Sequence, residues 1–141
     1  MFKISHRGNV SGITEMENHP DYIDTAIGLG YDVEIDVWDV FNAFALGHDV
    51  PQYEIDLDFL LSRKNSLWCH AKNLGALYKM LDCKIHCFWQ QNDDYAITSK
   101  GYIFTHSSIA EKTDRSILVS LDGTLDVFGA SGVCSDFVEN Y

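Results

Sequence analysis

Two acidic residues alternate with apolar ones in the segment Val33-Glu34-Ile35-Asp36-Val37. In a β-strand, residues i and i+2 point to the same side, so Glu34 and Asp36 would lie next to each other while the apolar residues face the opposite side. Two neighbouring carboxylates repel each other unless a cation lies between them. The segment therefore predicts a site for a divalent metal ion. The alternative is an amphipathic strand whose acidic side faces solvent.

Histidines stand before and after this acidic segment. His6 is followed by Arg7, and His48 is followed by Asp49. Because imidazole titrates near neutral pH, each histidine can accept or donate a proton. Cleavage of a phosphodiester needs neutralisation of its charge, a base for the nucleophile and an acid for the leaving oxygen. These residue types fit that reaction, although Arg7 could instead form a structural ion pair with Glu17 or Asp49.

The elements that would position these residues follow from the spacing of apolar side chains. The spacing predicts helices at 20–27, 55–61 and 74–81. It predicts strands at 2–5, 32–40, 44–46, 66–70, 84–89, 95–98, 102–105, 116–119 and 132–135. The first half alternates strand and helix, which favours a parallel sheet, whereas the second half is too short for full crossover helices.

The composition indicates one globular domain over residues 1–141, because the chain is 46% hydrophobic. A net charge of −11, with only ten Lys and Arg residues, argues against nucleic acid or an anionic membrane as a partner. No apolar stretch approaches the roughly 20 residues that span a bilayer. The N-terminus lacks the apolar core of a signal peptide. We therefore expect a cytoplasmic protein that does not bind membranes.

Five segments in order along the chain carry a family resemblance. They are His6-Arg7-Gly8, Glu17-Asn18, Gly30 to Val37, Gly47-His48-Asp49 and Gly132 to Asp136. Together they resemble the glycerophosphodiester phosphodiesterases, whose superfamily includes phosphatidylinositol-specific phospholipases C and spider-venom phospholipases D. The resemblance implies a reduced TIM-type (β/α) barrel, a PI-PLC-like phosphodiesterase fold with some outer helices or strands missing. It also implies a site at the carboxyl ends of the strands.

The resemblance assigns a role to each matching residue. His6 and His48 would form the catalytic acid/base pair, and Arg7 would contact the phosphate. Glu34 and Asp36 would bind one divalent cation, for which we expect Mg²⁺ before Mn²⁺ or Ca²⁺.

One position departs from the family pattern. The third metal-binding carboxylate of the family lies in a Glu-x-Lys pattern, and this chain has His70-Ala71-Lys72 there. We expect His70 to be the third metal ligand and Lys72 to contact the phosphate. An imidazole in place of a carboxylate shifts the preference of the site away from Ca²⁺.

The predicted function is a metal-dependent phosphoric diester hydrolase acting on a soluble diester, either a small molecule or a polymer precursor. The nucleophile would be water or a substrate hydroxyl, and the second case would produce a cyclic phosphate first. The alternative is a weak or inactive phosphoester-binding or metal-binding module. Trp89 is a candidate surface for substrate stacking, with Gln90, Asp93 or Asp94 at the pocket mouth. The alternative is that residues 88–94 form an aromatic strand that ends in a polar loop.

Three further patterns have simpler interpretations. We expect the four cysteines to be buried thiols, although Cys83, His86 and Cys87 offer an alternative zinc site. His19, His86 and His106 are expected to be surface or packed residues. The segment 117–125 resembles the Asp-x-Asp-Gly-Thr-Leu signature of haloacid-dehalogenase-type phosphatases, but Ser120 replaces its nucleophilic aspartate. A turn at Asp122-Gly123 is the prediction there.

Overall fold

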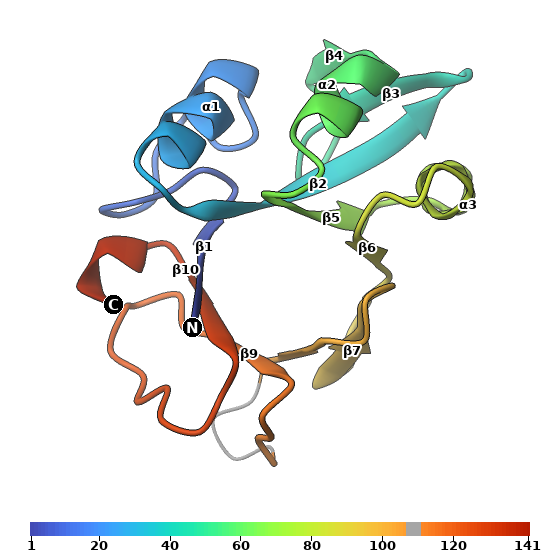
Figure 1. Cartoon of the computed structure of the whole chain (residues 1–141). Coiled ribbons are helices and arrows are strands. Elements are labelled where there is room, and N and C mark those ends of the chain that lie inside the picture. The colour runs from blue at the N-terminus through green and yellow to red at the C-terminus, as the bar shows by residue number, and fades with distance from the viewer. Residues whose placement is uncertain (107–110) are drawn as a thin grey trace.

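The computed structural model of the chain describes residues 1–106 and 111–141 (Figure 1). Its strands are β1 (Phe2–His6), β2 (Asp32–Val40), β3 (Ala43–Leu46), β4 (Tyr53–Ile55), β5 (Leu67–Ala71), β6 (Cys87–Phe88), β7 (Tyr95–Ile97), β8 (Ile103–Thr105), β9 (Ser116–Val119) and β10 (Gly132–Ser135). Its helices are α1 (Pro20–Gly28), α2 (Leu57–Ser62), α3 (Leu74–Asp82) and the 3-10 helix η1 (Val138–Asn140).

The ten strands form one mixed sheet with β2 as its central element. β2 pairs in parallel with β1 and β5, and its last residues pair antiparallel with β3. From β1 the sheet continues through β10, β9 and β8 to β7, and from β5 it continues to β6. An isolated antiparallel bridge joins Phe88 to Thr98. The sheet therefore curls on itself (Figure 1).

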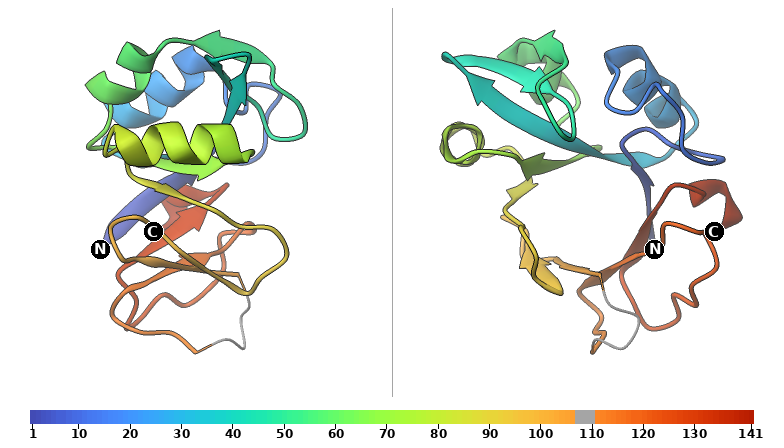
Figure 2. Two further views of the ribbon diagram at one scale, coloured as in Figure 1. Left: turned by 90° about the vertical axis from the view of Figure 1, so that its right-hand side faces the viewer. Right: turned by 180° about the vertical axis from the view of Figure 1, so that it is seen from behind.

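The predicted reduced TIM-type (β/α) barrel is wrong. β3, β4 and β7 run antiparallel to their neighbours, and the three α-helices among the described residues are short and all precede β6. Figure 2 shows the three α-helices in one half of the molecule, whereas the other half holds strands, loops and the short 3-10 helix η1. The connection 98–102 is too short for a helix, and the connection 120–131 contains none. The architecture is a strand-dominated curled half-barrel.

Most of the predicted strands and helices are present, with two local differences. The strand predicted at 84–89 is reduced to the two residues of β6. The helix predicted at 55–61 begins later, because Ile55 pairs with Phe44 in the antiparallel β3–β4 ladder. Asp56 then caps α2 by accepting a hydrogen bond from the backbone N–H of Phe59 at 2.8 Å.

The alternating pattern of β2 separates two cores. Val33, Ile35 and Val37 are fully buried in a cluster with the apolar sides of the three helices. The inside of the curl holds a second cluster, formed by Ile4, Trp68, Phe88, Ala96, Phe104, Ile117 and Cys134. Since successive strand residues point to opposite faces, Glu34 and Asp36 must face the inside of the curl.

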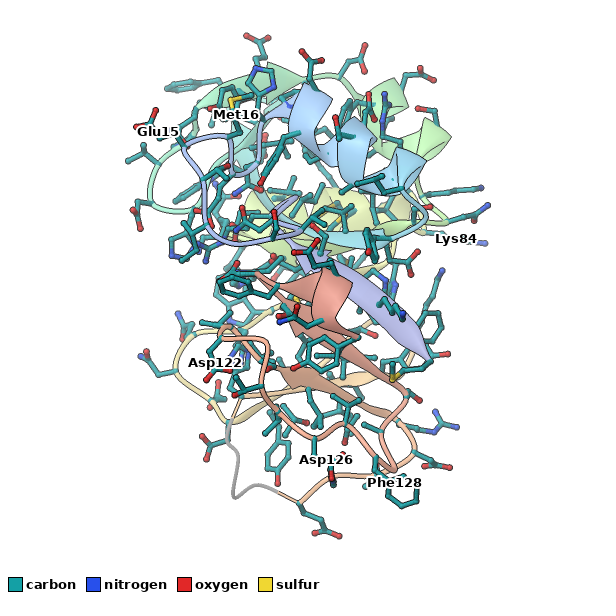
Figure 3. All side chains as sticks on the ribbon, turned by 90° about the vertical axis from the view of Figure 1, so that its left-hand side faces the viewer. Glu15, Met16, Lys84, Asp122, Asp126 and Phe128 are labelled. Carbon is teal, nitrogen blue, oxygen red and sulfur yellow. The ribbon has the colours of Figure 1, made fainter. Side chains whose placement is uncertain are left out.

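Loops cover the outer face of the second half. The 3-10 helix η1 packs on β1 and β10, and Leu118 and Val133 are buried on this side. The loop 120–131 is exposed at its tip, where Phe128 lies on the outside of the molecule (Figure 3). The predicted turn at Asp122-Gly123 is confirmed, since the Asp122 carboxylate accepts the backbone N–H of Thr124 at 3.1 Å. Among the described residues, no helix has the length and apolar character needed to cross a membrane.

Candidate metal and acid-base site

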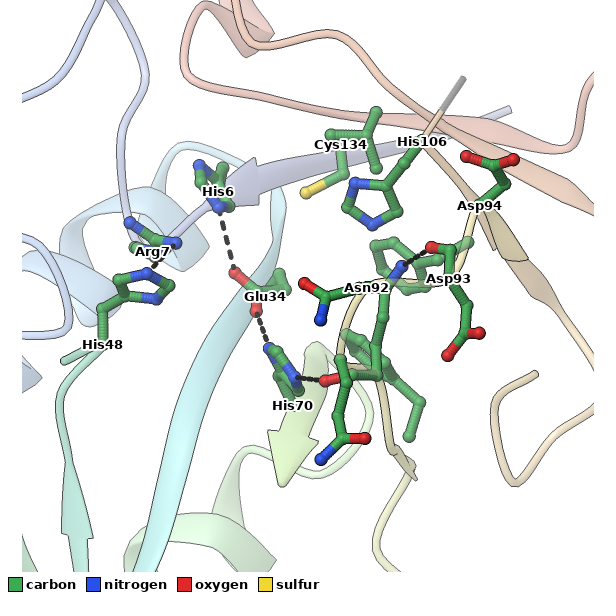
Figure 4. A pocket seen from close by; sticks show the side chains of 15 residues that line it. His6, Arg7, Glu34, His48, His70, Asn92, Asp93, Asp94, His106 and Cys134 are labelled. Atoms are coloured by element: carbon green, nitrogen blue, oxygen red, sulfur yellow. Dashed lines mark hydrogen bonds and ion pairs between the residues drawn. The ribbon is translucent and has the colours of Figure 1, made fainter. Parts of the chain in front are cut away.

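Parallel strand pairing brings the predicted site residues together. In the register of the sheet, His6 of β1 lies beside Glu34 of β2, and Asp36 of β2 lies beside His70 of β5. His6 and His70 stand near the carboxyl ends of β1 and β5, and they meet the first half of the longer β2, which carries Glu34 and Asp36, at one edge of the sheet. Figure 4 shows Glu34 between His6 and His70, with ion-pair distances of 3.8 and 3.9 Å to their ring nitrogens.

A cavity of about 350 Å³ opens over this edge (Figure 4). Its polar wall on the strand side is formed by His6, Arg7, Glu34, His48 and His70. Its opposite wall consists of the loop 90–94 and His106, and its apolar floor includes Phe88, Phe104, Val119 and Cys134. The size suits a small molecule or the end of a larger one.

The two carboxylates of β2 fit a metal ion. Glu34 Oε2 and Asp36 Oδ1 are buried without a hydrogen-bond partner. The second oxygen of Asp36 accepts a hydrogen bond from the Asn18 amide at 2.9 Å, which fixes the plane of the carboxylate. Ligand atoms of Glu34, Asp36 and His70 all lie within 4.8 Å of one another. An unpaired buried carboxylate oxygen is costly, and a divalent cation at this point would remove the cost.

The same two carboxylates differ in acidity. Burial raises the pKa of Glu34, and the neighbouring Asp36 charge raises it further. Burial also acts to raise the pKa of Asp36, but the imidazoles of His48 and His70 and the charge of Arg7 outweigh it and hold that pKa well below its usual range. Asp36 is therefore the permanent anion of the pair.

A buried aspartate that the sequence analysis assigned no role orients His6. Asp136, which follows β10, accepts a hydrogen bond from His6 Nδ1 at 2.7 Å. This contact leaves Nε2 of neutral His6 as a free lone pair on the cavity side. Burial lowers the pKa of His6, but the Asp136 hydrogen bond and the Glu34 charge raise it above its usual value overall. The resemblance included Asp136 only as the end of a strand-like segment.

Asn9 ties this aspartate to the rest of the site. Its amide nitrogen donates to Glu17 at 2.7 Å and to Asp136 at 2.8 Å, and its oxygen accepts from the Tyr22 hydroxyl at 3.2 Å. His6, Glu17 and Asp136 also lie within 4.8 Å of one another. Because the Asn9 amide already stands between the two carboxylates, this second group is a hydrogen-bond network and needs no cation.

Arg7 and His48 lie side by side at the opposite end of the carboxylate pair. Arg7 Nε lies 3.1 Å from Asp36 Oδ2, and Arg7 Nη2 lies 3.4 Å from His48 Nε2. Arg7 also forms an ion pair with Glu17 at 3.5 Å. The structural ion pair named as an alternative is therefore formed, and Arg7 also lines the cavity as predicted. The tight turn that delivers His48 requires Gly47, where a Cβ would collide with the Val50 carbonyl.

Two residues predicted to contact substrate lie elsewhere. Lys72 Nζ stands 3.9 Å from Asp36 Oδ1, so it lies near the carboxylates but is not part of the cavity lining. Trp89 packs against the first core cluster and does not line the cavity. The polar loop that follows Trp89 lines it instead, and the prediction that Gln90, Asp93 or Asp94 lies at the pocket is confirmed.

His106 belongs to the cavity wall, which its isolated position in the sequence did not indicate. Its backbone N–H donates to the Asp94 carbonyl at 2.9 Å, and this contact holds it against the loop 90–94. Partial desolvation against the cavity wall lowers the pKa of its imidazole, and the charges of His6 and His70 lower it further. His106 is exposed, as predicted for a surface histidine, but it faces the same cavity as the other imidazoles (Figure 4).

The alternative zinc site is not assembled. His86 is buried, as predicted, and shares a hydrogen bond of 2.8 Å with the Thr98 hydroxyl. Cys87 is also buried, but Cys83 is exposed after the end of α3, against the prediction of a buried thiol. Within the described parts of the chain, neither group of clustered metal-ligand residues includes these three.

Comparison of the chain with protein-family models, with curated proteins and with solved structures gives no match. The function must therefore be inferred from the geometry and chemistry of the site itself. The site contains one metal-ligand group of two carboxylates and one imidazole. Three further imidazoles and an arginine line the adjoining cavity.

Proposed function

We propose that this protein is a metal-dependent phosphodiesterase of the glycerophosphodiester type. The main support is the pair of buried oxygens on Glu34 and Asp36 that have no hydrogen-bond partner. Glu34 lies in the cavity wall beside His6, and Asp36 lies behind that wall beside His48. His70 completes the ligand set. When bound, a divalent cation would neutralise charge on the phosphoryl oxygens of a diester.

His6 is the general base in this proposal. Asp136 holds the proton on Nδ1, so Nε2 can take a proton from the attacking hydroxyl, which belongs either to water or to the substrate. As the new P–O bond forms, the bond between phosphorus and the leaving oxygen breaks. In the second case the first product is a cyclic phosphate.

His48 is the general acid, and Arg7 is the phosphate contact. Arginine has only donors, so His48 Nε2 accepts in the 3.4 Å contact with Arg7 Nη2. The phosphate would draw Arg7 toward itself and free His48 Nε2, which in its protonated form gives a proton to the leaving oxygen. Lys72 stands close enough to Asp36 to offset part of its charge.

The alternative function is a phosphoester-binding or metal-binding module without turnover. Replacement of a carboxylate by His70 favours it, because the ligand set then carries less negative charge. The contact between Arg7 and His48 also favours it, because it occupies the nitrogen that catalysis needs.

The test is hydrolysis of bis(4-nitrophenyl) phosphate by chelator-treated protein supplied with Mg²⁺, Mn²⁺ or Ca²⁺ in turn. The proposal expects metal-dependent release of nitrophenolate that Glu34→Gln abolishes. Calorimetry with glycerol-3-phosphate on the same protein distinguishes the enzyme from a binding module without turnover. Tight binding without any product under all three metals would refute the enzyme and support the module.

A further inference from the structure

We propose that the cation site prefers a first-row transition ion, such as Mn²⁺ or Zn²⁺, over Mg²⁺ and Ca²⁺. The inference rests on the proposed metal site but not on turnover, and it replaces Mg²⁺ as the expected ion. It comes from how His70 is held.

Two contacts fix the ring of His70 as a nitrogen donor. Its Nε2 lies 3.1 Å from the backbone carbonyl of Gln90, which can only accept, so the proton of neutral His70 is on Nε2. In the neutral ring, which is the form that binds a metal, Nδ1 presents its lone pair toward the carboxylates. Phe88 stacks on the ring with centroids 4.9 Å apart and planes 12° from parallel, which fixes the plane of the ring. An orienting carbonyl of this kind is typical of metal-bound histidine.

The donor atoms have the spacing of neighbouring ligands on one ion. His70 Nδ1 lies 3.3 Å from Asp36 Oδ1 and 3.9 Å from Glu34 Oε1. Ligands at roughly 2.1 Å from an ion with right-angled geometry are about 3.0 Å apart. A small closure of the site would therefore bring one nitrogen and two oxygens onto a single ion.

The charge of the site works against hard cations. Mg²⁺ and Ca²⁺ depend on oxygen ligands, and Ca²⁺ takes six to eight of them. The group offers only two carboxylates. The negative charge of one of them, Asp36, is already partly neutralised by Arg7 Nε at 3.1 Å and Lys72 Nζ at 3.9 Å. Imidazole binds first-row transition ions better than Mg²⁺ or Ca²⁺, which favours Mn²⁺ and, more strongly, Zn²⁺.

The experiment is calorimetric titration of the chelator-treated protein (residues 1–141) with Mn²⁺, Mg²⁺ and Ca²⁺ separately. Mn²⁺ is the main probe because, unlike Zn²⁺, it has little affinity for the exposed thiol of Cys83. We expect Mn²⁺ to bind at least tenfold more tightly than either other ion. His70→Asp, which restores a third carboxylate, should reduce that ratio tenfold or more. Equal affinities in the wild type, or an unchanged ratio in a folded His70→Asp protein, would overturn the proposal.

A second measurement needs no substitution at His70. In long-range ¹H–¹⁵N spectra of the Cys83→Ser protein, Zn²⁺ should shift His70 Nδ1 while Nε2 keeps its proton. An unperturbed Nδ1 at saturating Zn²⁺ would refute ligation by this nitrogen. Mn²⁺ preference without hydrolysis would leave this inference standing and refute the phosphodiesterase. Hydrolysis by a protein that binds Mg²⁺ and Mn²⁺ equally well would support the phosphodiesterase and refute the preference for Mn²⁺.

Discussion

At the scale of single residues, the imidazoles of His6 and His70 each contact an oxygen acceptor through one ring nitrogen. That acceptor keeps the proton on the contacting nitrogen and leaves the other nitrogen free to accept a proton or bind a metal. Asp136 holds the Nδ1 proton of His6, and the Gln90 carbonyl holds the Nε2 proton of His70. His6 therefore presents Nε2 to the cavity, and His70 presents Nδ1 to the carboxylates. In the proposed site, two residues of the same type thus acquire different chemistry, His6 in proton transfer and His70 in metal binding.

Removing the acceptor behind His6 should reduce activity without removing substrate binding. In Asp136→Asn, the amide can present an N–H to the ring and favour the wrong tautomer. We expect kcat to fall by about 10²-fold or more with little change in KM, because only proton transfer is affected. Steady-state kinetics would show this split. The control is Asp126→Asn on the exposed loop 120–131, and equal kcat in both variants would contradict the role of Asp136.

The stability of the protein should fall in acid because of His86. Burial, with a smaller contribution from the Lys100 charge, lowers the pKa of His86 from 6.5 to about 4. Between these pH values the unfolded chain binds a proton that the folded protein does not, so stability decreases as the pH falls.

We expect this residue to contribute a loss on the order of 2 kcal/mol between pH 7 and 4.5, allowing for partial solvent screening. Urea unfolding of the wild type and of His86→Gln at both pH values measures it. A matching pH dependence in the two proteins would contradict the prediction.

Site residues could be identified from the sequence where the pattern that marks them lies within a few neighbouring residues. The i and i+2 spacing placed Glu34 and Asp36 side by side, and the structure brings His70 to them as expected. Asp136 reaches His6 across 130 residues through the pairing of β1 with β10. His106 likewise depends on how distant strands meet, so a short motif does not identify it.

At the scale of elements, α3 is fastened to the far end of β2 through one asparagine. The Asn73 side chain caps the helix at the backbone N–H of Ala76 and bonds both the N–H and the carbonyl of Asp39. Gly75 passes so close to Asp39 that a Cβ would collide with its carboxylate. The strand that carries the proposed metal ligands is thereby held against the helix that covers it.

Asn73→Ala should destabilise the protein by about 2 kcal/mol, since it removes a helix cap and two hydrogen bonds to β2. Thermal unfolding or urea titration would measure the change. Asn65→Ala is the matched control, because Asn65 is exposed and makes no side-chain hydrogen bond within the described residues. A loss no larger than that of the control would show that this connection does not stabilise the fold.

Elements were predictable because their signals are short-range. Apolar spacing located the three helices and most strands. It missed β4, whose three residues carry no clear alternation, and it overestimated β6. Whether such a short segment forms a strand depends on the strand it pairs with. For β4 that partner is set by the turn between β3 and β4 rather than by the residues of β4.

At the scale of the whole molecule, the curl of the sheet separates two tasks. The helices bury the outer side of β2 and β5, while the inner side holds aromatic residues and the polar cavity. The resemblance implied a (β/α) barrel because its residues come mostly from the first half, where strands and helices alternate. The second half has short connections and antiparallel pairs, which local patterns do not reveal.

Metal binding should stabilise the entire fold, because the ligands belong to the strand at the centre of the sheet. At an ion concentration 100 times the dissociation constant, the gain is about 2.7 kcal/mol, or a rise in Tm of roughly 8 °C. Thermal unfolding with and without Mn²⁺ measures it. In Glu34→Gln the rise should vanish while the metal-free Tm is no lower, since a buried, repelling carboxylate is gone. A rise of equal size in this variant would place the ion elsewhere.

The most direct test of the two-histidine phosphodiesterase is the hydrolysis of bis(4-nitrophenyl) phosphate by the Mn²⁺-loaded wild type, His6→Ala and His48→Ala. His86→Gln, whose substitution lies outside the cavity lining, serves as the control. We predict metal-dependent turnover in the wild type and the control, and a loss of about 10²-fold or more in each alanine variant. Undiminished hydrolysis by a folded His6→Ala or His48→Ala protein would contradict the assignment.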